Sequence, residues 1–388
     1  MPSANVDDLL RPWWERLEAD LPGMRPFDAH THIGESDPDG FRSSAAELTA
    51  LLAEVDARAV MFPMQEPNGY PAANVRVLRE AEASGGRLVP FCRLDPHDHP
   101  VREAERCLAA GARGIKLHPR AERFGLGDRH ADGIFALAGE RQVPVLVHAG
   151  RGIPALGRDA LVICRRHPGV RLILAHAGIS DLGWIWRCVD DHPNLYFDTA
   201  WWSAADLLAL FALVPPGRIL WASDAPYGTA LEAAVMTLRC GLQAGLDAEQ
   251  AAGVLGGQLE RLLEGGEPLD LGPALGTDGI RVDVLLQRVE AFLVIAVNRL
   301  MHGEDADEPL ALARLACEVG EEAPQANVCR SVLALLDRRE RLAALGASGT
   351  PQAPGVHLVV IAAALTRTPD VPLPVCPEPV EVGERIGP

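Results

Sequence analysis

The chain has 388 residues, 48% of them hydrophobic, which is enough for a large buried core and too long for one ordinary domain other than a barrel. Its formal net charge is −17 and its pI is near 5.1, a balance that repels phosphate backbones and anionic lipid surfaces. We therefore expect no nucleic acid and no membrane among its partners.

Targeting and redox signals are weak throughout the chain. The first residues lack the basic segment and apolar core of a signal peptide, and no uncharged apolar run is long enough to cross a bilayer. The eight cysteines lie far apart without a Cys-x-x-Cys pair, which is typical of reduced, buried thiols. These features predict a cytoplasmic protein.

The first part of the chain alternates between two kinds of segment. Residues 1–25 hold a predicted helix, about Val6–Leu21, placed below or outside the domain that follows. Residues 26–264 then contain eight short apolar runs, with helix-like segments such as Ser44–Asp56 between them. Near-continuous apolar runs are typical of parallel strands covered on both faces. The alternation predicts an α/β fold, a (β/α)8 or TIM barrel. The runs are Pro26–Gly34, Ala57–Gln65, Arg87–Pro96, Ala112–Pro119, Val143–Gly150, Arg171–Gly178, Asn194–Trp201 and Ile219–Pro226.

The pattern changes after the barrel. Residues 265–276 are a Gly/Pro-rich linker, 277–368 form a predicted C-terminal α-helical region, and 369–388 are a proline-rich tail expected to be extended or disordered. Helical spacing is clear in Val282–Met301 and Ala326–Leu345, whereas Gly355–Arg367 suits a helix or a strand. The apolar faces of these helices must pack on something. They could extend a substrate lid, form a homo-oligomer interface or bind another protein.

Most of the apolar runs end in ionisable side chains. In a TIM barrel the carboxyl ends of the strands form the catalytic face, so these side chains should meet at one mouth. His30 and His32 alternate along one strand and point the same way. Imidazole nitrogens and carboxylate oxygens bind divalent cations such as zinc. The strand-end residues are His30, His32, Arg93, Asp95, Lys116, His118, His148, His176, Asp198 and Asp224.

Lys116 is the single lysine among 36 basic residues. An amine can lose its proton, whereas a guanidinium remains charged at any accessible pH. The lysine is either present here by chance, or the position needs a deprotonable amine or holds a cation for an acidic substrate. A structural salt bridge would not explain why arginine is absent here.

Five motifs together resemble the amidohydrolase superfamily. They are Asp28–His32 (DAHTH), Gly114–Pro119 (GIKLHP), His148 in VHAG, His176 in AHAG and Asp224 in SDAPYG. The match is to the branch that includes aminocarboxymuconate semialdehyde decarboxylase and related hydrolases and decarboxylases, over about residues 26–264.

The resemblance implies a metal centre. It assigns His30, His32, His148 and Asp224 as ligands, and His176 as a ligand of a second metal or as a polarising group. Some superfamily members carboxylate a lysine on the fourth strand to bridge two metals, which would be Lys116 here. We expect one or two divalent ions, zinc first, with manganese or iron as alternatives.

The function expected is a metal-dependent hydrolase that cleaves a C–N or C–O bond (amide, ester or lactone) with an activated water. Asp224, His176 and Lys116 are the expected catalytic residues. A small carboxylate-bearing substrate is expected because arginine forks match carboxylates and tryptophan and tyrosine can wall an apolar pocket. The alternatives are non-oxidative decarboxylation of an aromatic or unsaturated acid and, third, a non-catalytic binding or assembly protein. The expected substrate-binding residues are Arg93, His118, Arg120, Arg151, Trp201, Trp202 and Tyr227.

Overall fold

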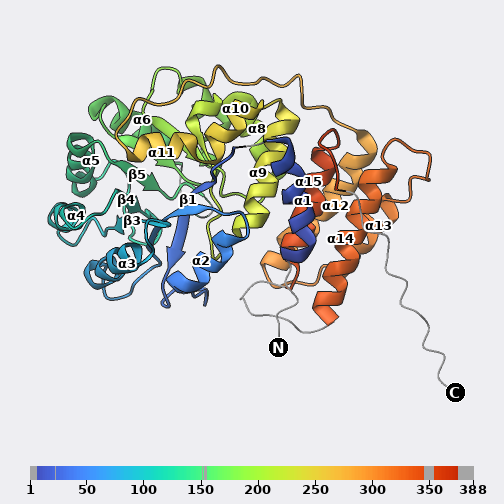
Figure 1. Cartoon of the computed structure of the whole chain (residues 1–388), viewed down its shortest axis with the longest axis horizontal. Helices are drawn as coiled ribbons and strands as arrows, with labels where there is room; N and C mark the ends of the chain where they lie inside the picture. Colours follow the sequence, from blue (N-terminus) through green and yellow to red (C-terminus); the bar gives the residue numbers. More distant parts are fainter. Residues whose placement is uncertain (1–6, 22, 151, 153–154, 345–353, 375–388) are drawn as a thin grey trace.

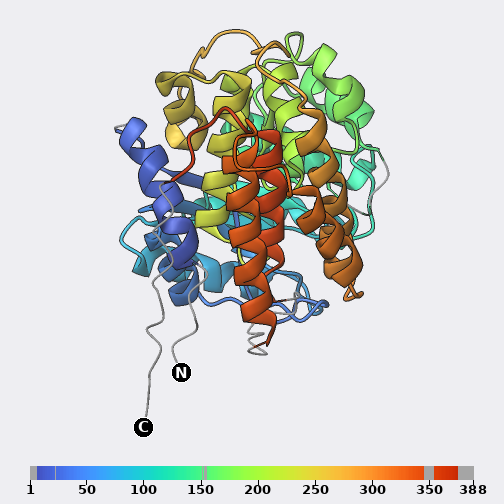
Figure 2. The ribbon, with the colours of Figure 1, turned by 90° about the vertical axis from the view of Figure 1, so that its right-hand side faces the viewer.

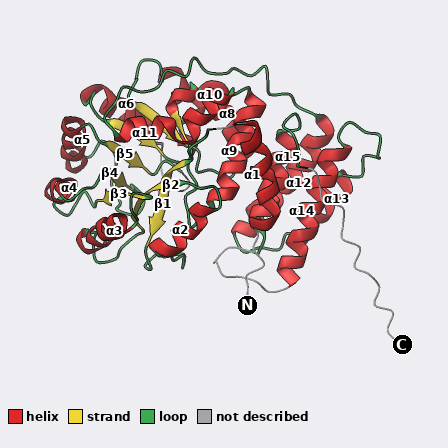
Figure 3. Cartoon of the chain, in the orientation of Figure 1, coloured by secondary structure: helices red, strands yellow, loops and turns green. Residues whose placement is uncertain are grey.

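Eight parallel strands form the centre of the structure, a computed structural model that describes residues 7–21, 23–150, 152, 155–344 and 354–374. Each strand pairs in parallel with the next in chain order, from β1 to β8. Figure 3 shows the strands surrounded by helices on one side of the molecule and helices alone on the other. The strands are β1 (Phe27–Ile33), β2 (Arg58–Pro63), β3 (Leu88–Arg93), β4 (Gly114–Leu117), β5 (Pro144–Val147), β6 (Arg171–Leu174), β7 (Leu195–Asp198) and β8 (Ile219–Leu220).

The barrel closes between β1 and the segment that follows β8. The amide of Ala29 donates to Trp221 O at 2.9 Å, and the amide of His32 donates to Ala225 O at 2.8 Å. In the opposite direction, the amide of Asp224 donates to His30 O at 2.9 Å. The short strand β8 is thus extended by irregular backbone whose hydrogen bonds fix Asp224 beside the end of β1.

Helices cover the outside of the barrel, so the predicted (β/α)8 fold with additional C-terminal helices is confirmed. The N-terminal helix α1 packs on α9 outside the barrel. Ser44 begins α2 with a capping box to Glu47, and Thr229 caps α9 through the amide of Glu232. The helices are α1 (Asp7–Asp20), α2 (Ala45–Ala53), α3 (Pro71–Ala83), α4 (Pro100–Ala109), α5 (Arg129–Arg141), α6 (Gly157–Arg166), α7 (Leu182–Ile185), α8 (Ala204–Leu213), α9 (Ala230–Ala244), α10 (Ala248–Ala252) and α11 (Gln258–Leu263).

Two apolar layers hold the barrel together. The inner layer comes from side chains inside the strands, among them Phe27, Val60, Phe91 and Leu146. The outer layer lies between strands and helices and continues without a break into the C-terminal helices. Burial of this kind is the main source of stability in such a domain.

The C-terminal region forms a helical bundle beside the barrel. Helix α15 packs against α12 and α14 and also against α8 and α9 of the barrel, and most of its residues are buried. Figures 1 and 2 show these helices standing next to α1 and α9. Gly355–Arg367, for which a helix or a strand was expected, is helical. The bundle consists of α12 (Val284–Met301), α13 (Asp307–Ala316), α14 (Ala326–Ala344) and α15 (Val356–Arg367).

Arg239 of α9 ties the end of the bundle to the barrel. Its buried guanidinium donates four hydrogen bonds, to Thr368 Oγ1 at 3.0 Å, Thr368 O at 2.8 Å, Val371 O at 3.2 Å and Pro372 O at 3.0 Å. Burial lowers the pKa of Arg239 to about 10. The chain after α15 therefore has a fixed position against α9.

None of the described helices is both long and apolar enough to cross a membrane. Two sequence expectations fall outside the described residues: the position of Arg151, and the course of the proline-rich tail over 375–388.

Candidate metal centre

A cavity of about 630 Å³ opens at the carboxyl ends of the strands. Most of the ionisable residues expected at the mouth line it, among them His30, His32, Lys116, His176 and Asp224, whereas Asp95 and Asp198 do not. Ligands of TIM barrels bind at this end. Every strand-end motif of the sequence thus contributes to one hollow.

Two imidazoles of β1 meet the carboxylate that follows β8. His30 Nε2 lies 3.2 Å from Asp224 Oδ1, and His32 Nε2 lies 3.1 Å from the same oxygen. The His-x-His spacing places both rings on the inner face of the strand, as alternation requires. Three potential ligand atoms therefore converge across the closure of the barrel.

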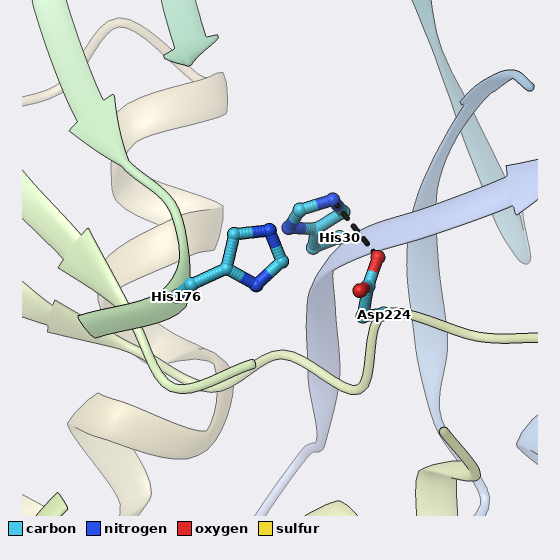
Figure 4. A group of neighbouring side chains, drawn as sticks. All are labelled: His30, His176 and Asp224. Carbon is cyan, nitrogen blue, oxygen red and sulfur yellow. Dashed lines mark ion pairs between the residues drawn. The ribbon is translucent and has the colours of Figure 1, made fainter. Parts of the chain in front are cut away.

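A second pair of imidazoles lies beside the first. His176 Nε2 is 2.9 Å from His148 Nδ1. His176, His30 and Asp224 each offer one ligand atom, and these three atoms lie within 4.8 Å of one another. Figure 4 shows the three side chains facing a common space, His30 from β1 and the other two from the segments that follow β6 and β8. The resemblance had named His148 and not His176 for the first ion, yet the compact triplet contains His176.

Lys116 is fully buried next to this group. Its Nζ lies 3.1 Å from His30 Nε2 and 4.8 Å from the centroid of the Phe62 ring. Burial lowers the pKa of Lys116 to about 7, and this effect outweighs the nearby carboxylates of Asp224 and Asp198. Burial therefore favours the neutral form of this amine.

Asp198 holds two of the imidazole residues in place. Its Oδ2 accepts from His30 Nδ1 at 2.8 Å, and its Oδ1 accepts from the amide of His176 at 2.7 Å. The first contact leaves Nε2 of a neutral His30 as the free lone pair, the arrangement common behind metal-bound histidines. His176 Nδ1 donates to Ala200 O at 2.7 Å, so in a neutral His176 the lone pair is on Nε2, the nitrogen beside His148.

The backbone at these positions has an unusual conformation. His176, Ala177 and Asp224 have φ angles of 58°, 57° and 57°. Such left-handed geometry costs about 1–3 kcal/mol for a non-glycine residue and persists where surrounding structure requires it. Gly150 is also constrained, because a Cβ there would lie 2.6 Å from His176 Cδ2. The glycine of the VHAG motif thus makes room for the ring of His176.

The donor set fits a divalent cation. Burial lowers the pKa values of His30, His32 and His176, so their imidazoles are neutral and carry lone pairs. Burial raises the pKa of Asp28 and Asp198 to about 7 and of Asp224 to about 6. A cation would offset the burial of these carboxylates.

A model of the amidohydrolase family matches residues 24–272, well over half of the chain. The chain belongs to the amidohydrolase family. This confirms the superfamily resemblance of the sequence motifs. Members of this family are metal-dependent enzymes, and the residues described above offer this amidohydrolase a metal site. A search with the sequence found no significant match among curated proteins.

Solved structures share the barrel of this amidohydrolase. The 5-carboxyvanillate decarboxylase of Sphingomonas paucimobilis is 14% identical, with a TM-score of 0.51 over 62% of this chain and 99% of that chain. The 4-oxalomesaconate hydratase of Rhodopseudomonas palustris is 17% identical, with a TM-score of 0.48 over 62% of this chain and 96% of its own.

A third similar structure was solved with a metal. It is a 5-carboxyvanillate decarboxylase of Novosphingobium aromaticivorans complexed with manganese, 14% identical, with a TM-score of 0.49 over 62% of this chain and 96% of its own. At such identities the likeness concerns the fold. The C-terminal bundle of this amidohydrolase lies outside the family match.

The basic residues expected to bind substrate differ in their surroundings. Arg93 lines the cavity, but its Nη2 donates to the buried Glu122 carboxylate at 2.8 Å and its Nη1 donates to Pro63 O at 3.3 Å. Arg120 is exposed at the rim, where Arg123 joins it. Arg123 had not been singled out from the sequence, since it follows the strand motif by several residues.

The aromatic residues expected around the substrate also line the cavity. His118 stacks on His148 with ring centroids 3.9 Å apart. Trp201 lies 6.3 Å from His176 between ring centroids, with Trp202 next to it. The hydroxyl of Tyr227 donates to Asp37, and its ring meets the edge of His32. These rings form an apolar wall around the metal ligand candidates.

Proposed function

We propose that this amidohydrolase is a metal-dependent hydrolase that cleaves an amide, ester or lactone bond in a small, carboxylate-bearing substrate. The observation that carries the proposal is the convergence of His30, His32 and Asp224, with Lys116 Nζ 3.1 Å from His30 Nε2. His148 and His176 complete a set of five imidazole and carboxylate donors around this lysine.

The number of donors favours two cations. A mononuclear catalytic zinc typically takes three protein ligands and a water. The present set exceeds that, and Lys116 lies beside it with an amine whose burial favours the neutral form. Only a neutral amine can add carbon dioxide to form a bridging carbamate. Zinc is the first candidate because the donors are mainly imidazoles, with manganese or iron as alternatives.

Bound divalent cations supply polarisation of the scissile carbonyl and a lowered pKa for a bound water. Asp224 is the proton acceptor for the attacking water, because its carboxylate lies against both β1 imidazoles at the bottom of the cavity. It then returns the proton to the leaving nitrogen or oxygen. His176, oriented by Ala200 O, would use its Nε2 lone pair to help hold the cation that offsets the charge developing on the carbonyl oxygen.

The cavity walls orient the substrate in this scheme. Arg120 and Arg123 at the rim offer forks for a substrate carboxylate. Trp201, Trp202 and Tyr227 hold the apolar part and exclude water. Arg93 is a weaker candidate for direct contact, because Glu122 already neutralises its charge.

The test is a panel of small esters, amides, lactones and carboxylic acids, supplied to metal-loaded protein with both acid release and carbon dioxide release measured. We expect acid release from one of the first three classes, abolished in Asp224→Asn. Carbon dioxide release from an unsaturated or aromatic acid, with no hydrolysis, would replace this proposal by the decarboxylase alternative.

A further inference from the structure

The bundle α12–α15 reaches the cavity, although it lies outside the region matched by the family model. Met301 at the end of α12 and Val356, His357 and Val360 in the first turns of α15 all line the hollow that also contains His30 and Asp224. Since α15 also packs on α9, the bundle and the barrel share one wall.

This side of the cavity is mainly apolar. Met236 and Ala233 of α9 face the same hollow as Met301, Val356 and Val360. Thr229 and Glu232 lie at the start of α9, where the threonine hydroxyl is used as the helix cap. An apolar wall of this kind favours a hydrocarbon portion of a ligand over water.

His357 stands out among these side chains. Its Nε2 is buried and has no hydrogen-bond partner among the residues that the structure describes. Burial lowers the pKa of His357 to about 4, so the ring is neutral at pH 7 and can both donate and accept. A buried polar atom without a partner is destabilising, and such atoms are uncommon in folded proteins.

The ring of His357 can present Nε2 to the cavity. The residue lines the hollow, and the terminal torsion of histidine is broad, so rotation about the Cβ–Cγ bond changes which ring edge faces the hollow. Its neighbours on α12 and α15 in the cavity wall, Met301, Val356 and Val360, carry no charge. A neutral hydrogen-bonding group of a ligand would satisfy the orphaned nitrogen.

We propose that α12 and α15 complete the substrate cavity as a distal subsite, in which Met301 and Val360 contact an apolar chain or ring and His357 hydrogen-bonds a neutral hydroxyl or carbonyl on it. The inference rests on the proposed function for the location of the reacting group at the metal centre. It adds a substrate class: acyl compounds with an apolar portion that ends in a neutral polar group.

The test measures binding, so that it does not depend on turnover. The ligands are butanoate, hexanoate and octanoate and the same acids with a terminal hydroxyl, titrated calorimetrically into the metal-loaded full chain. These acids resemble the acid released by a hydrolase. Affinity should rise with chain length by a few-fold per methylene while the chain contacts the apolar wall.

The variant His357→Leu removes the hydrogen bond and keeps an apolar side chain. For the acid whose chain is long enough to reach α15, the variant should lower the affinity of the hydroxy acid by about fivefold to tenfold. It should lower the affinity of the unsubstituted acid of the same length by less than about twofold. His357→Gln should restore part of the difference. His302→Leu, at the exposed end of α12, is the matched control and should change neither series.

Met301→Trp tests the apolar wall independently, should His357→Leu fail to fold. The larger tryptophan side chain should lower the affinity for octanoate by at least about fivefold more than the affinity for butanoate. Three results would each overturn the proposal. His357→Leu could weaken both series of acids equally, or change the affinity of neither series at any chain length. The third is that the wild-type protein binds none of these acids. If the predicted differences in affinity are found but no hydrolysis is detected, the distal subsite stands and the hydrolase proposal is refuted. If hydrolysis is detected and the variants of His357 and Met301 leave it unchanged, only the subsite is refuted.

Discussion

Asp198 Oδ2 and His30 Nδ1 are 2.8 Å apart, although they belong to the first and seventh strands of the barrel. The carboxylate fixes the tautomer of the imidazole and turns its Nε2 toward Asp224 and Lys116. Asp198, which does not line the cavity, thus sets the orientation of the His30 ring.

Asp198→Asn keeps the shape of this contact and removes its charge. We expect metal affinity to fall by about 10–100-fold, because a neutral amide oxygen holds the imidazole less firmly than the carboxylate and does not raise its basicity. Competition with a fluorescent chelator measures the change. Asp206→Asn, on the outer helix α8, is the control. An affinity equal to that of wild type would show that Asp198 has no role in positioning His30.

Gly150→Ala should disturb His176 without unfolding the barrel. The added Cβ would lie 2.6 Å from His176 Cδ2, so the ring of His176 must shift from its position. We expect activity to drop by at least about tenfold, because small misplacements of catalytic groups are costly. Gly183→Ala on α7, where an added Cβ meets nothing within 4 Å, is the matched control. Retained activity in both variants would contradict the placement of His176 at the reacting centre.

Arg239→Met should loosen the bundle from the barrel. The substitution leaves Thr368 O and Val371 O without their donor, so we expect the free energy of unfolding to fall by about 3 kcal/mol. Chemical denaturation measures it, and limited proteolysis should cleave first within the bundle. Arg288→Met, exposed on α12, is the control and should lie within about 0.5 kcal/mol of wild type. Equal stability of the two variants would show that the anchor is unimportant.

His357 should make stability depend on pH. Its folded pKa of about 4 lies below its ordinary value of 6.5. The unfolded chain therefore takes up a proton between pH 6.5 and pH 4 while the folded chain does not, so the folded state loses stability as the pH falls. His357→Leu should remove up to about 3 kcal/mol of that loss. Denaturation of both proteins from pH 7 to pH 4 tests this, with His302→Leu as the control. Parallel curves for wild type and His357→Leu would contradict the burial of a neutral imidazole.

The sequence was sufficient for the barrel because its signal is local. Apolar runs mark every strand, ionisable residues mark the carboxyl end of most of them, and the structure has a strand within each run. The last strand is shorter than its run Ile219–Pro226, since the backbone after Leu220 turns to bond with Val254 and with β1. Such a departure depends on partners far along the chain, which periodicity does not reveal.

The site was visible in the sequence only in part. The ligand candidates lie in motifs, and Lys116 was prominent as the sole lysine. Asp198 was visible as a strand-end carboxylate, but its contact with His30 depends on barrel closure. His357 has no distinguishing motif in the sequence, because its place in the cavity follows from how α15 packs on α9. Long-range packing of appended helices has no local pattern in the sequence.

The most direct test is the metal content per chain, measured by plasma mass spectrometry on protein purified without chelator and supplied with zinc and bicarbonate. The proposed function predicts about two equivalents in wild type, falling to one or fewer in Lys116→Ala, because that variant lacks the amine whose carbamate would bridge the two cations. About one equivalent in both proteins would contradict the two-metal site and make Lys116 a substrate contact. No metal in either would contradict the proposed chemistry as a whole.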